Sequence, residues 1–581
     1  MGKMFFSKRL FLVLLPVAGL LVYSKALGAP FVFDDGLYVL KNPWIRSLSN
    51  LADLSASRYM GDLSFALNYR LSGAEPLGYH LVNVIIHIVN AALLFFIIRA
   101  VFSSPLVKGS VPALDEASRD AVAALTSLIF LCHPVNTQAV TYVSQRYTSL
   151  AALFYLGALL FYLKARLAGG EGGGRGGRGG GGGGEGESPG RGRLFYLVSI
   201  ISTVLAMKTK EISFTIPFMI AILEAGLFHP EDKRRYLRLV PFFLTLFIIP
   251  LSILLPAPAD GNAAQEFMRL KKMEDLGSVH WYPYLLTQSE VVVTYLRLVF
   301  VPVNQKFNYH WPLATSLFEP RILASTLFLS SVMILSVSGL IRSVKRRSAP
   351  VALFSLGLIW FFLTLSVESS VIPIRDVINE HRLYLPIAGI IFSSVCALFY
   401  LKVFLEKKYG AVLKTPAFAA LLLALIVLPL SLAAYSRNEV WSDPLSLYAD
   451  EVEKNPVEAG PHLYLGLAYA ESGQTEEAAR EFERAVGIKP DFFTARGNLA
   501  NTYLRLGKVD DAMEEYRTLI KQDPSRVFPH FNLAVLYMKK GLYDDAEKEL
   551  EETLRLEPEN TRATTLLGYL RNGLEEKIII N

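Results

Sequence analysis

Residues 10–36 read LFLVLLPVAGLLVYSKALGAPFVFDDG, in which an apolar run, Leu10 to Val22, is closely followed by the adjacent carboxylates Asp34 and Asp35. A membrane helix formed by this run holds the acidic pair at the membrane face, where a side chain meets lipid-borne and water-borne reactants together. Such a position suits a catalytic base. Because Asp-Asp-Gly is also ordinary turn chemistry, the function of the pair depends on what the rest of the chain places beside it.

The chain as a whole is too apolar to be soluble throughout, with 581 residues, 52% hydrophobic content and a mean hydropathy of +0.35. Lys8 and Arg9 before the first run allow a signal peptide cleaved near Ala26-Leu27-Gly28, but we expect an uncleaved anchor because further spans follow. Apolar runs near the ~20 residues that cross a bilayer predict about eleven spans. They are residues 10–22, 81–102, 121–131, 150–167, 194–207, 212–228, 237–255, 322–341, 351–367, 385–405 and 417–434.

Positive charge gathers on one side of these spans. Basic clusters at residues 175–193, 233–238, 342–347 and 407–408 all fall on the side of the N-terminus. By the positive-inside rule this side is cytoplasmic, so the acidic pair and the C-terminal domain lie outside. Residues 441 to 581 hold 17 basic and 26 acidic residues, a net charge of −9 within a chain total of +6, which leaves +15 for residues 1 to 440. This excess sets membrane orientation and does not predict nucleic-acid binding.

Two stretches between the spans have other predicted roles. Residues 169–192 contain 16 glycines among 24 residues, which predicts a flexible cytoplasmic linker; without a Gly-Lys-Ser/Thr element they do not form a phosphate-cradling loop. Residues 284–301 lie between two prolines, and their polar side chains recur on one side of a helix. This pattern is typical of an interfacial helix on the outer surface, acting as a lid or a platform.

After Trp441 the sequence repeats with a period of 34 residues. Leu465-Gly466, Tyr469, Gly473, Ala478 and Pro490 recur as Leu499-Ala500, Tyr503, Gly507, Ala512 and Pro524, and a third copy ends at Pro558. Three copies in phase predict tetratricopeptide repeats, an α-solenoid in which small residues let paired helices approach closely. The repeats are expected at about 459–492, 493–526 and 527–560, after a half-repeat and before a capping helix.

Several short motifs follow one another in an order typical of one family. They are Phe33-Asp34-Asp35 with Lys41-Asn42-Pro43, His133-Pro134-Val135 with Gln145-Arg146, Lys210-Glu211, and Glu380-His381-Arg382-Leu383-Tyr384-Leu385-Pro386. Through these, over nearly its whole length, the chain resembles the transmembrane and tetratricopeptide-repeat protein O-mannosyltransferases, within the GT-C class of multi-span glycosyltransferases that use lipid-phosphate sugars. It departs from the family at Gln138, where members often have Glu, and at His381, where they often have Arg.

The resemblance implies an all-α fold, with a polytopic GT-C-type helix bundle over residues 1–440 and a tetratricopeptide-repeat solenoid over residues 441–581. It also implies inverting transfer of a sugar from a polyprenyl-phosphate carrier to an extracytoplasmic hydroxyl, such as a protein Ser or Thr. The family's first-loop acidic residue matches Asp34 or Asp35. We expect Asp35 to be the base, with Asp34 orienting the acceptor or holding a divalent metal, although no cofactor is certain.

A lipid phosphate needs cations, and the predicted topology brings four to the face of the acidic pair: Arg146, Lys208, Lys210 and Arg382. Snorkelling from helix ends is the ordinary alternative for each of them. Four more residues of the motifs are candidates for contact with the sugar or the acceptor: His133, Glu211, Glu380 and His381. Cys132 and Cys396 lie in apolar runs and indicate neither a disulfide nor a zinc site.

The repeats offer a groove for an acceptor protein. Asn498 and Asn532 occupy the same repeat position on the inner helix, with Asn501 one turn on. Their amides are expected to hold the backbone of an extended peptide, although Asn is common at this position in such repeats.

Two further functions stay open from the residues alone. One is a non-catalytic scaffold, in which the bundle anchors a protein-binding array for envelope assembly. The other is an enzyme that modifies glycan or lipid hydroxyls. The exposed segments carry no Asn-x-Ser/Thr sequon, which favours a bacterial inner membrane with the repeats in the periplasm over the endoplasmic reticulum of a eukaryote.

The predicted orientation can be tested with reporters fused after Asn581. Because the basic clusters place the C-terminal domain outside, a periplasm-active reporter at this position should be active in a bacterial host. A cytoplasm-only reporter serves as the matched control and should be silent. Activity of the cytoplasmic reporter would overturn the eleven-span count.

Overall fold

The computed structural model describes residues 8–48, 58–110, 114–168, 189–228, 235–254, 280–309, 311–370, 372–374, 376–410 and 415–572. It divides into two compact units, Met1–Ser442 and Asp443–Asn581. Within the described residues all regular secondary structure is helical. The all-α prediction is therefore confirmed, while most of the predicted glycine linker, residues 169–188, lies outside the described residues.

The first unit is built from long helices joined by short helical turns. Its main helices are α1 (Lys8–Val22), α2 (Tyr59–Ser72), α3 (Pro76–Phe102), α5 (Glu116–Cys132), α7 (Arg146–Ala168), α8 (Pro189–Met207), α9 (Ile216–Leu227), α10 (Arg235–Leu244), α11 (Ile248–Leu254), α13 (Trp281–Phe300), α14 (Pro320–Arg346), α15 (Ala349–Leu365), α16 (Ile387–Tyr409), α17 (Thr415–Leu422) and α18 (Leu428–Val440). Shorter pieces are α4 (Pro105–Lys108), α6 (Thr137–Thr141) and several 3-10 or π turns, including η2 (Gly36–Leu40), η7 (Glu211–Thr215) and η9 (Glu380–Leu383).

In the part of the chain that the structure describes, every predicted span overlaps helical segments of this unit, and the spans at 212–228, 237–255 and 417–434 each comprise more than one segment. Among the described residues, 7 helical stretches are long and apolar enough to cross a membrane, and Arg9–Val22 and Ala349–Leu365 are shorter apolar helices. The protein is thus a multi-helix membrane protein. The count of eleven and the orientation remain predictions.

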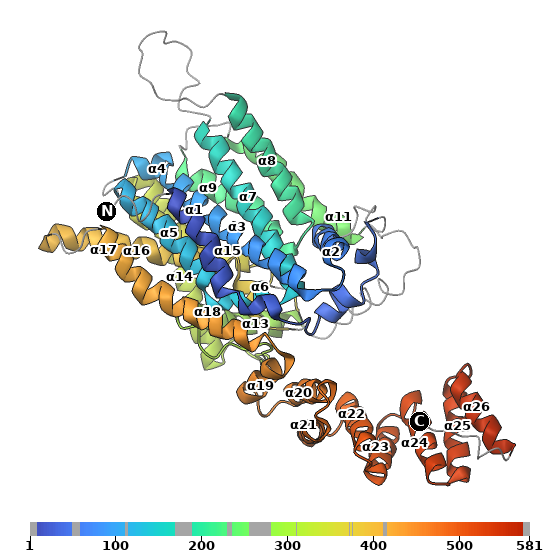
Figure 1. Ribbon diagram of the computed structural model, residues 1–581. Helices are drawn as coiled ribbons and strands as arrows, with labels where there is room; N and C mark the ends of the chain where they lie inside the picture. Colours follow the sequence, from blue (N-terminus) through green and yellow to red (C-terminus); the bar gives the residue numbers. More distant parts are fainter. Residues whose placement is uncertain are drawn as a thin grey trace, which may run out of the picture. The chain divides into compact units, whose positions relative to one another are not determined.

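Helices of the first unit pack pairwise into a bundle (Figure 1). α7 lies beside α8, α3 beside α5 and α7, and α14, α15 and α16 pack in succession. α15 and α16 approach most closely where Gly357 faces Gly389, because a Cβ on either glycine would collide with the backbone carbonyl of the other. Small residues at a helix crossing are the usual means of close packing in membranes.

The second unit is a solenoid of antiparallel helix pairs. α20 (Ala459–Glu471) pairs with α21 (Thr475–Ile488), α22 (Phe493–Arg505) with α23 (Val509–Gln522), and α24 (Val527–Lys539) with α25 (Tyr543–Leu556). α19 (Pro444–Lys454) precedes the pairs and α26 (Thr561–Arg571) follows them. The predicted tetratricopeptide-repeat solenoid is confirmed.

The 34-residue period has two physical causes in this unit. Gly473, Gly507 and Gly541 end the first helix of each pair with φ between +72° and +80°, a conformation that favours glycine. A His or Arg side chain also recurs at residues 462, 496 and 530, where it meets a carboxylate of the next helix and a proline carbonyl of the preceding turn. His462, for example, has Nδ1 at 2.6 Å from Glu481 Oε2 and Nε2 at 3.2 Å from the Pro456 carbonyl. Each clamp ties a repeat to the turn before it.

Candidate active site

Asp35 fixes the first loop of the membrane unit against the start of α7. Its carboxylate is buried, with 1% exposure. Oδ2 accepts the Val32 N–H at 3.1 Å within the same loop, and Oδ1 accepts the Ser144 N–H at 2.7 Å, from the turn before α7. Burial raises the pKa of Asp35 to about 7, while the two N–H donors act in the opposite direction. Both oxygens are therefore occupied by the backbone.

Asp34 has a different environment from its neighbour. It is half-buried, and its backbone N–H donates to the Tyr142 hydroxyl at 3.0 Å. Phe33 before it has a φ of 50°, which is strained for a bulky residue and turns the chain so that the two adjacent carboxylates do not share one environment. The Phe33 ring meets the Phe307 ring edge to face at 5.3 Å. The structure thus distinguishes the two carboxylates, because Asp35 is buried and fixed while Asp34 is half-buried.

Two charged residues that the sequence motifs did not indicate lie at the start of α2: Arg58, which precedes the helix, and Asp62 in its first turn. Arg58 Nη2 lies 3.3 Å from Glu211 Oε2, and the negative charge of Glu211 raises the pKa of Arg58. Asp62, one turn on, accepts the Tyr147 hydroxyl at 2.5 Å, and burial raises its pKa to about 6. The only sequence signal for these residues is their four-residue spacing, which places both on one helix face.

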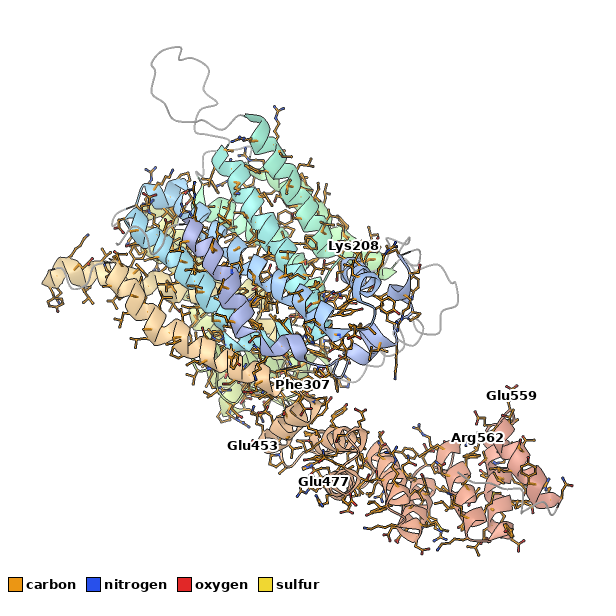
Figure 2. All side chains as sticks on the ribbon, viewed as in Figure 1. Lys208, Phe307, Glu453, Glu477, Glu559 and Arg562 are labelled. Carbon is orange, nitrogen blue, oxygen red and sulfur yellow. The ribbon has the colours of Figure 1, made fainter. Side chains whose placement is uncertain are left out.

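Lys210 is held in a buried ion pair. Its Nζ lies 2.7 Å from Glu368 Oε1 and donates to the Thr148 hydroxyl at 2.9 Å. Lys210 and Glu368 are 8% and 7% exposed, so the pair lies in a low-dielectric setting. Lys208 is half-buried at the end of α8 next to α2, where its carbonyl accepts the Met60 N–H at 3.0 Å (Figure 2).

The loop between α15 and α16 carries the remaining predicted residues. The His381 N–H donates to Gln138 Oε1 at 2.8 Å, and Arg382 donates to the carbonyls of Val377 and Asp376 at 3.1 and 2.5 Å. Side chains of α13, the predicted interfacial helix, bind backbone carbonyls of this loop. Three of its side chains do so: the Tyr284 hydroxyl donates to the Glu368 carbonyl at 2.6 Å, the Gln288 amide to Val377 at 3.0 Å and the Tyr295 hydroxyl to Asn379 at 2.9 Å.

The pKa values of two side chains reflect the charged groups that surround them in the folded site. Burial raises the pKa of Tyr38. Arg58 lowers this pKa, whereas the carboxylates of Asp34, Asp62 and Glu211 raise it. The pKa of His381 is held well below its ordinary value by burial and then by the positive charges of Lys210, Arg382 and Arg58. We call the carboxylates Asp34, Asp62 and Glu211 the acidic half of the site, and the cations Lys210, Arg382 and Arg58 its basic half. The two halves adjoin, because Arg58 pairs with Glu211, which follows Lys210 in the chain.

Three predicted site residues are engaged by groups of the protein itself. Arg146 is fully buried, and its guanidinium donates to Asn83 Oδ1 at 2.7 Å, Asn68 Oδ1 at 2.9 Å and the Tyr79 carbonyl at 2.9 Å. These acceptors on α2 and α3 stabilise its buried charge. Binding of the donor phosphate by Arg146 stays a prediction.

His133 and Glu380 also have partners within the protein. His133 Nε2 lies 2.9 Å from the Val299 carbonyl and joins the end of α5 to α13. Glu380 is 1% exposed, and its carboxylate accepts the Lys306 N–H at 2.9 Å, the Tyr309 hydroxyl at 2.6 Å and the Gln305 amide at 2.7 Å. Their contact with a sugar or an acceptor stays a prediction.

The described residues contain no group of three or more His, Cys, Asp or Glu side chains arranged to hold a metal ion. In the repeat unit, the Asn498 amide donates to the Thr494 carbonyl of its own helix at 2.9 Å. Asn501 Oδ1 accepts the Tyr516 hydroxyl at 2.6 Å, and Asn532 is half-buried on α24. Asn498 and Asn501 thus lie on α22 and Asn532 lies on α24, each the first helix of its repeat.

The fold and this site define a multi-helix membrane protein with a tetratricopeptide-repeat domain. Family models described as tetratricopeptide repeat match residues 469–529 and 527–560. The chain is 26% identical over 500 residues to protein O-mannosyl-transferase F38B6.6 of Caenorhabditis elegans, which covers 83% of this chain and 63% of that protein. It is 25% identical over 531 residues to human protein O-mannosyl-transferase TMTC1, which covers 84% of this chain and 56% of that protein.

The curated relatives of this chain are thus protein O-mannosyltransferases, as the sequence resemblance predicted. The chain spans about three fifths of the length of the relatives it matches. Among solved structures, the apo oligosaccharyltransferase of Archaeoglobus fulgidus aligns with 75% of this chain and 56% of its own, at 14% identity and a TM-score of 0.41.

The titration of Asp35 predicts how stability depends on pH. Because its pKa rises from 3.8 to about 7 on folding, the folded protein holds this proton more tightly than the unfolded chain. The resulting stability is present below about pH 4 and is lost as the pH rises through about 7. The unfolding midpoint of the wild type in detergent should fall relative to that of Asp35→Asn across this interval.

Asp115→Asn is the matched control, because Asp115 caps the N-terminus of α5 with a single accepted N–H. It should keep the pH dependence of the wild type. Equal pH dependence of the wild type and Asp35→Asn would show that the Asp35 carboxylate is not buried as described.

Proposed function

We propose that this chain transfers a sugar from a polyprenyl-phosphate donor to a hydroxyl of an extracytoplasmic protein. The observation that carries the proposal is the adjoining of an acidic half and a basic half through Arg58. Transfer from a phosphate carrier needs both, a base for the incoming hydroxyl and cations for the departing phosphate. The names of the relatives, protein O-mannosyl-transferases, make mannose the sugar that we propose for this chain.

In this proposal Asp34 is the base. As the acceptor oxygen forms its bond to the anomeric carbon, its proton passes to the Asp34 carboxylate, and the bond between the anomeric carbon and the phosphate oxygen breaks. The electron pair of that bond leaves with the polyprenyl phosphate. Asp35 acts as a positioning residue, because its two accepted backbone N–H groups hold the loop on which Asp34 lies. Attack opposite the leaving group inverts the anomeric centre.

The cations of the basic half stabilise the departing phosphate. An ammonium group has three N–H donors, and two of those on Lys210 are directed at Glu368 and Thr148. The third is left for a phosphate oxygen. Arg382 adds a planar guanidinium of which two nitrogens already donate to loop carbonyls, so that it is oriented before the donor arrives. Lys208 is a further cation at the edge of this half.

The base assignment can be tested with Asp34→Asn. This change keeps the shape of the side chain and removes its basicity, so transfer to a protein acceptor should fall by about 10²- to 10⁴-fold, measured by intact mass. The melting temperature in detergent is measured alongside, so that loss of transfer by a folded variant is distinguished from unfolding. Asp115→Asn, on the α5 N-terminus, is the matched control. Transfer at the parental rate by Asp34→Asn would remove Asp34 from the reaction.

Acceptor capture by the repeats is a separate prediction. Replacing Asn498 and Asn532 together with Ala should lower glycosylation of a protein acceptor several-fold while sparing hydrolysis of the donor, because only the acceptor contacts are lost. Gln474→Ala is the control, since Gln474 is an exposed amide in the turn between α20 and α21. Unchanged modification in the double variant would reduce the array to a scaffold.

A further inference from the structure

Glu368 has a hydrogen-bonding capacity that the protein does not use. Its side chain is nine-tenths buried, and Oε1 is paired with Lys210 at 2.7 Å. Oε2 is also buried, yet it meets no donor among the described residues, and the hydroxyl of the adjacent Ser369 is buried without a partner as well. Buried polar atoms almost always have a partner, since leaving one without costs about 1–3 kcal/mol. Unpartnered atoms on two consecutive buried residues indicate the place of a polar ligand.

The position of Glu368 is imposed by its surroundings. Its carbonyl accepts the Tyr284 hydroxyl of α13 at 2.6 Å, and its N–H donates to the Leu365 carbonyl at the end of α15 at 3.2 Å. With the backbone fixed at both sides and one carboxylate oxygen on Lys210, the second oxygen has a defined location. A carboxylate oxygen accepts hydrogen bonds only, so the ligand must present a donor there.

We propose that Glu368 recognises the sugar of the donor, with Oε2 accepting a hydrogen bond from the hydroxyl on the carbon next to the anomeric carbon. This inference rests on the proposed function, in which Lys210 binds the donor phosphate. The Glu368 carboxylate and the donor phosphate then both contact the Lys210 ammonium group, and the sugar is joined to that phosphate through its anomeric carbon. The sugar hydroxyl nearest the phosphate is therefore the one nearest Glu368.

This contact makes Glu368 a residue that determines specificity. Sugars that differ in configuration at the second carbon present this hydroxyl in different directions, and only one direction matches a fixed acceptor. A site built to hydrogen-bond a hydroxyl strongly rejects an analogue that lacks it, because its own polar group is then left unpaired. The contact also strengthens as positive charge develops at the anomeric carbon, as it does for the same hydroxyl in glycoside hydrolysis.

The test measures binding of three probes to the purified full chain in detergent: polyprenyl phosphate, polyprenyl-phosphate mannose and its 2-deoxy analogue. The wild type should bind the mannose donor roughly 10- to 100-fold more tightly than the 2-deoxy donor, as expected for one hydrogen bond to a charged group. Glu368→Gln should bind both donors equally and should bind polyprenyl phosphate as the wild type does. Glu368→Asp keeps the charge beside Lys210 and withdraws the oxygen, so it should lose the same discrimination even if the Gln variant does not fold.

Two results would overturn the inference. One is discrimination that persists in either Glu368 variant or is absent in the wild type. The other is equal weakening of all three probes by Glu368→Gln, which would make Glu368 only the counter-ion of Lys210. The proposed function fails separately: if Lys210→Gln leaves binding of polyprenyl phosphate unchanged, the phosphate site itself is misplaced.

Discussion

The bond between the Asp35 carboxylate and two backbone N–H groups is the constraint on which the site depends. It joins the loop after α1 to the turn before α7, and these segments are 109 residues apart in the chain. A buried carboxylate is stable only with such donors, because burial alone costs several kcal/mol. The same two bonds hold Asp35 in place, which suits it to positioning the loop. The neighbouring Asp34 is thereby given a fixed loop from which to act as the base that we propose.

The charges of the site stabilise one another across several elements. Arg58 of the segment before α2 pairs with Glu211 of η7, and Lys210 beside it pairs with Glu368 of the α15–α16 loop. Neighbouring residues 210 and 211 thus carry opposite charges into opposite halves of the site. Since each pair is at least partly buried, removing one member leaves its partner uncompensated, which is more destabilising than losing the pair. The network therefore holds loops from distant parts of the sequence at one end of the bundle.

The fold can be predicted from the sequence more completely than the site can. The 34-residue period and the apolar runs predict the helices because they reflect local packing, such as the positive φ of Gly473 or the close helix crossing at Gly357. The roles of charged residues depend on partners far away in the chain. Arg146 stands at a helix end like a phosphate ligand, but Asn68 and Asn83 satisfy it from α2 and α3. Asp34 and Asp35 are the same residue type in adjacent positions, and only the bend at Phe33 separates their environments. Glu368 lies in none of the sequence motifs, and only its buried, unpartnered oxygen marks it as a candidate site residue.

The contacts of the helix α13 favour a platform over a lid, the two roles predicted for it. Its side chains bind the α15–α16 loop through three backbone carbonyls, those of Glu368, Val377 and Asn379. Lifting the helix would break all three hydrogen bonds, at a net cost of roughly 0.5–1.5 kcal/mol each, and would disfavour the open state by roughly 10- to 1,000-fold. Because these bonds engage the backbone, the side chains of the loop remain available for chemistry. Rigid support of this kind suits a site that must hold a phosphate and a sugar at fixed distances, since misplacement by about 1 Å already slows a reaction strongly.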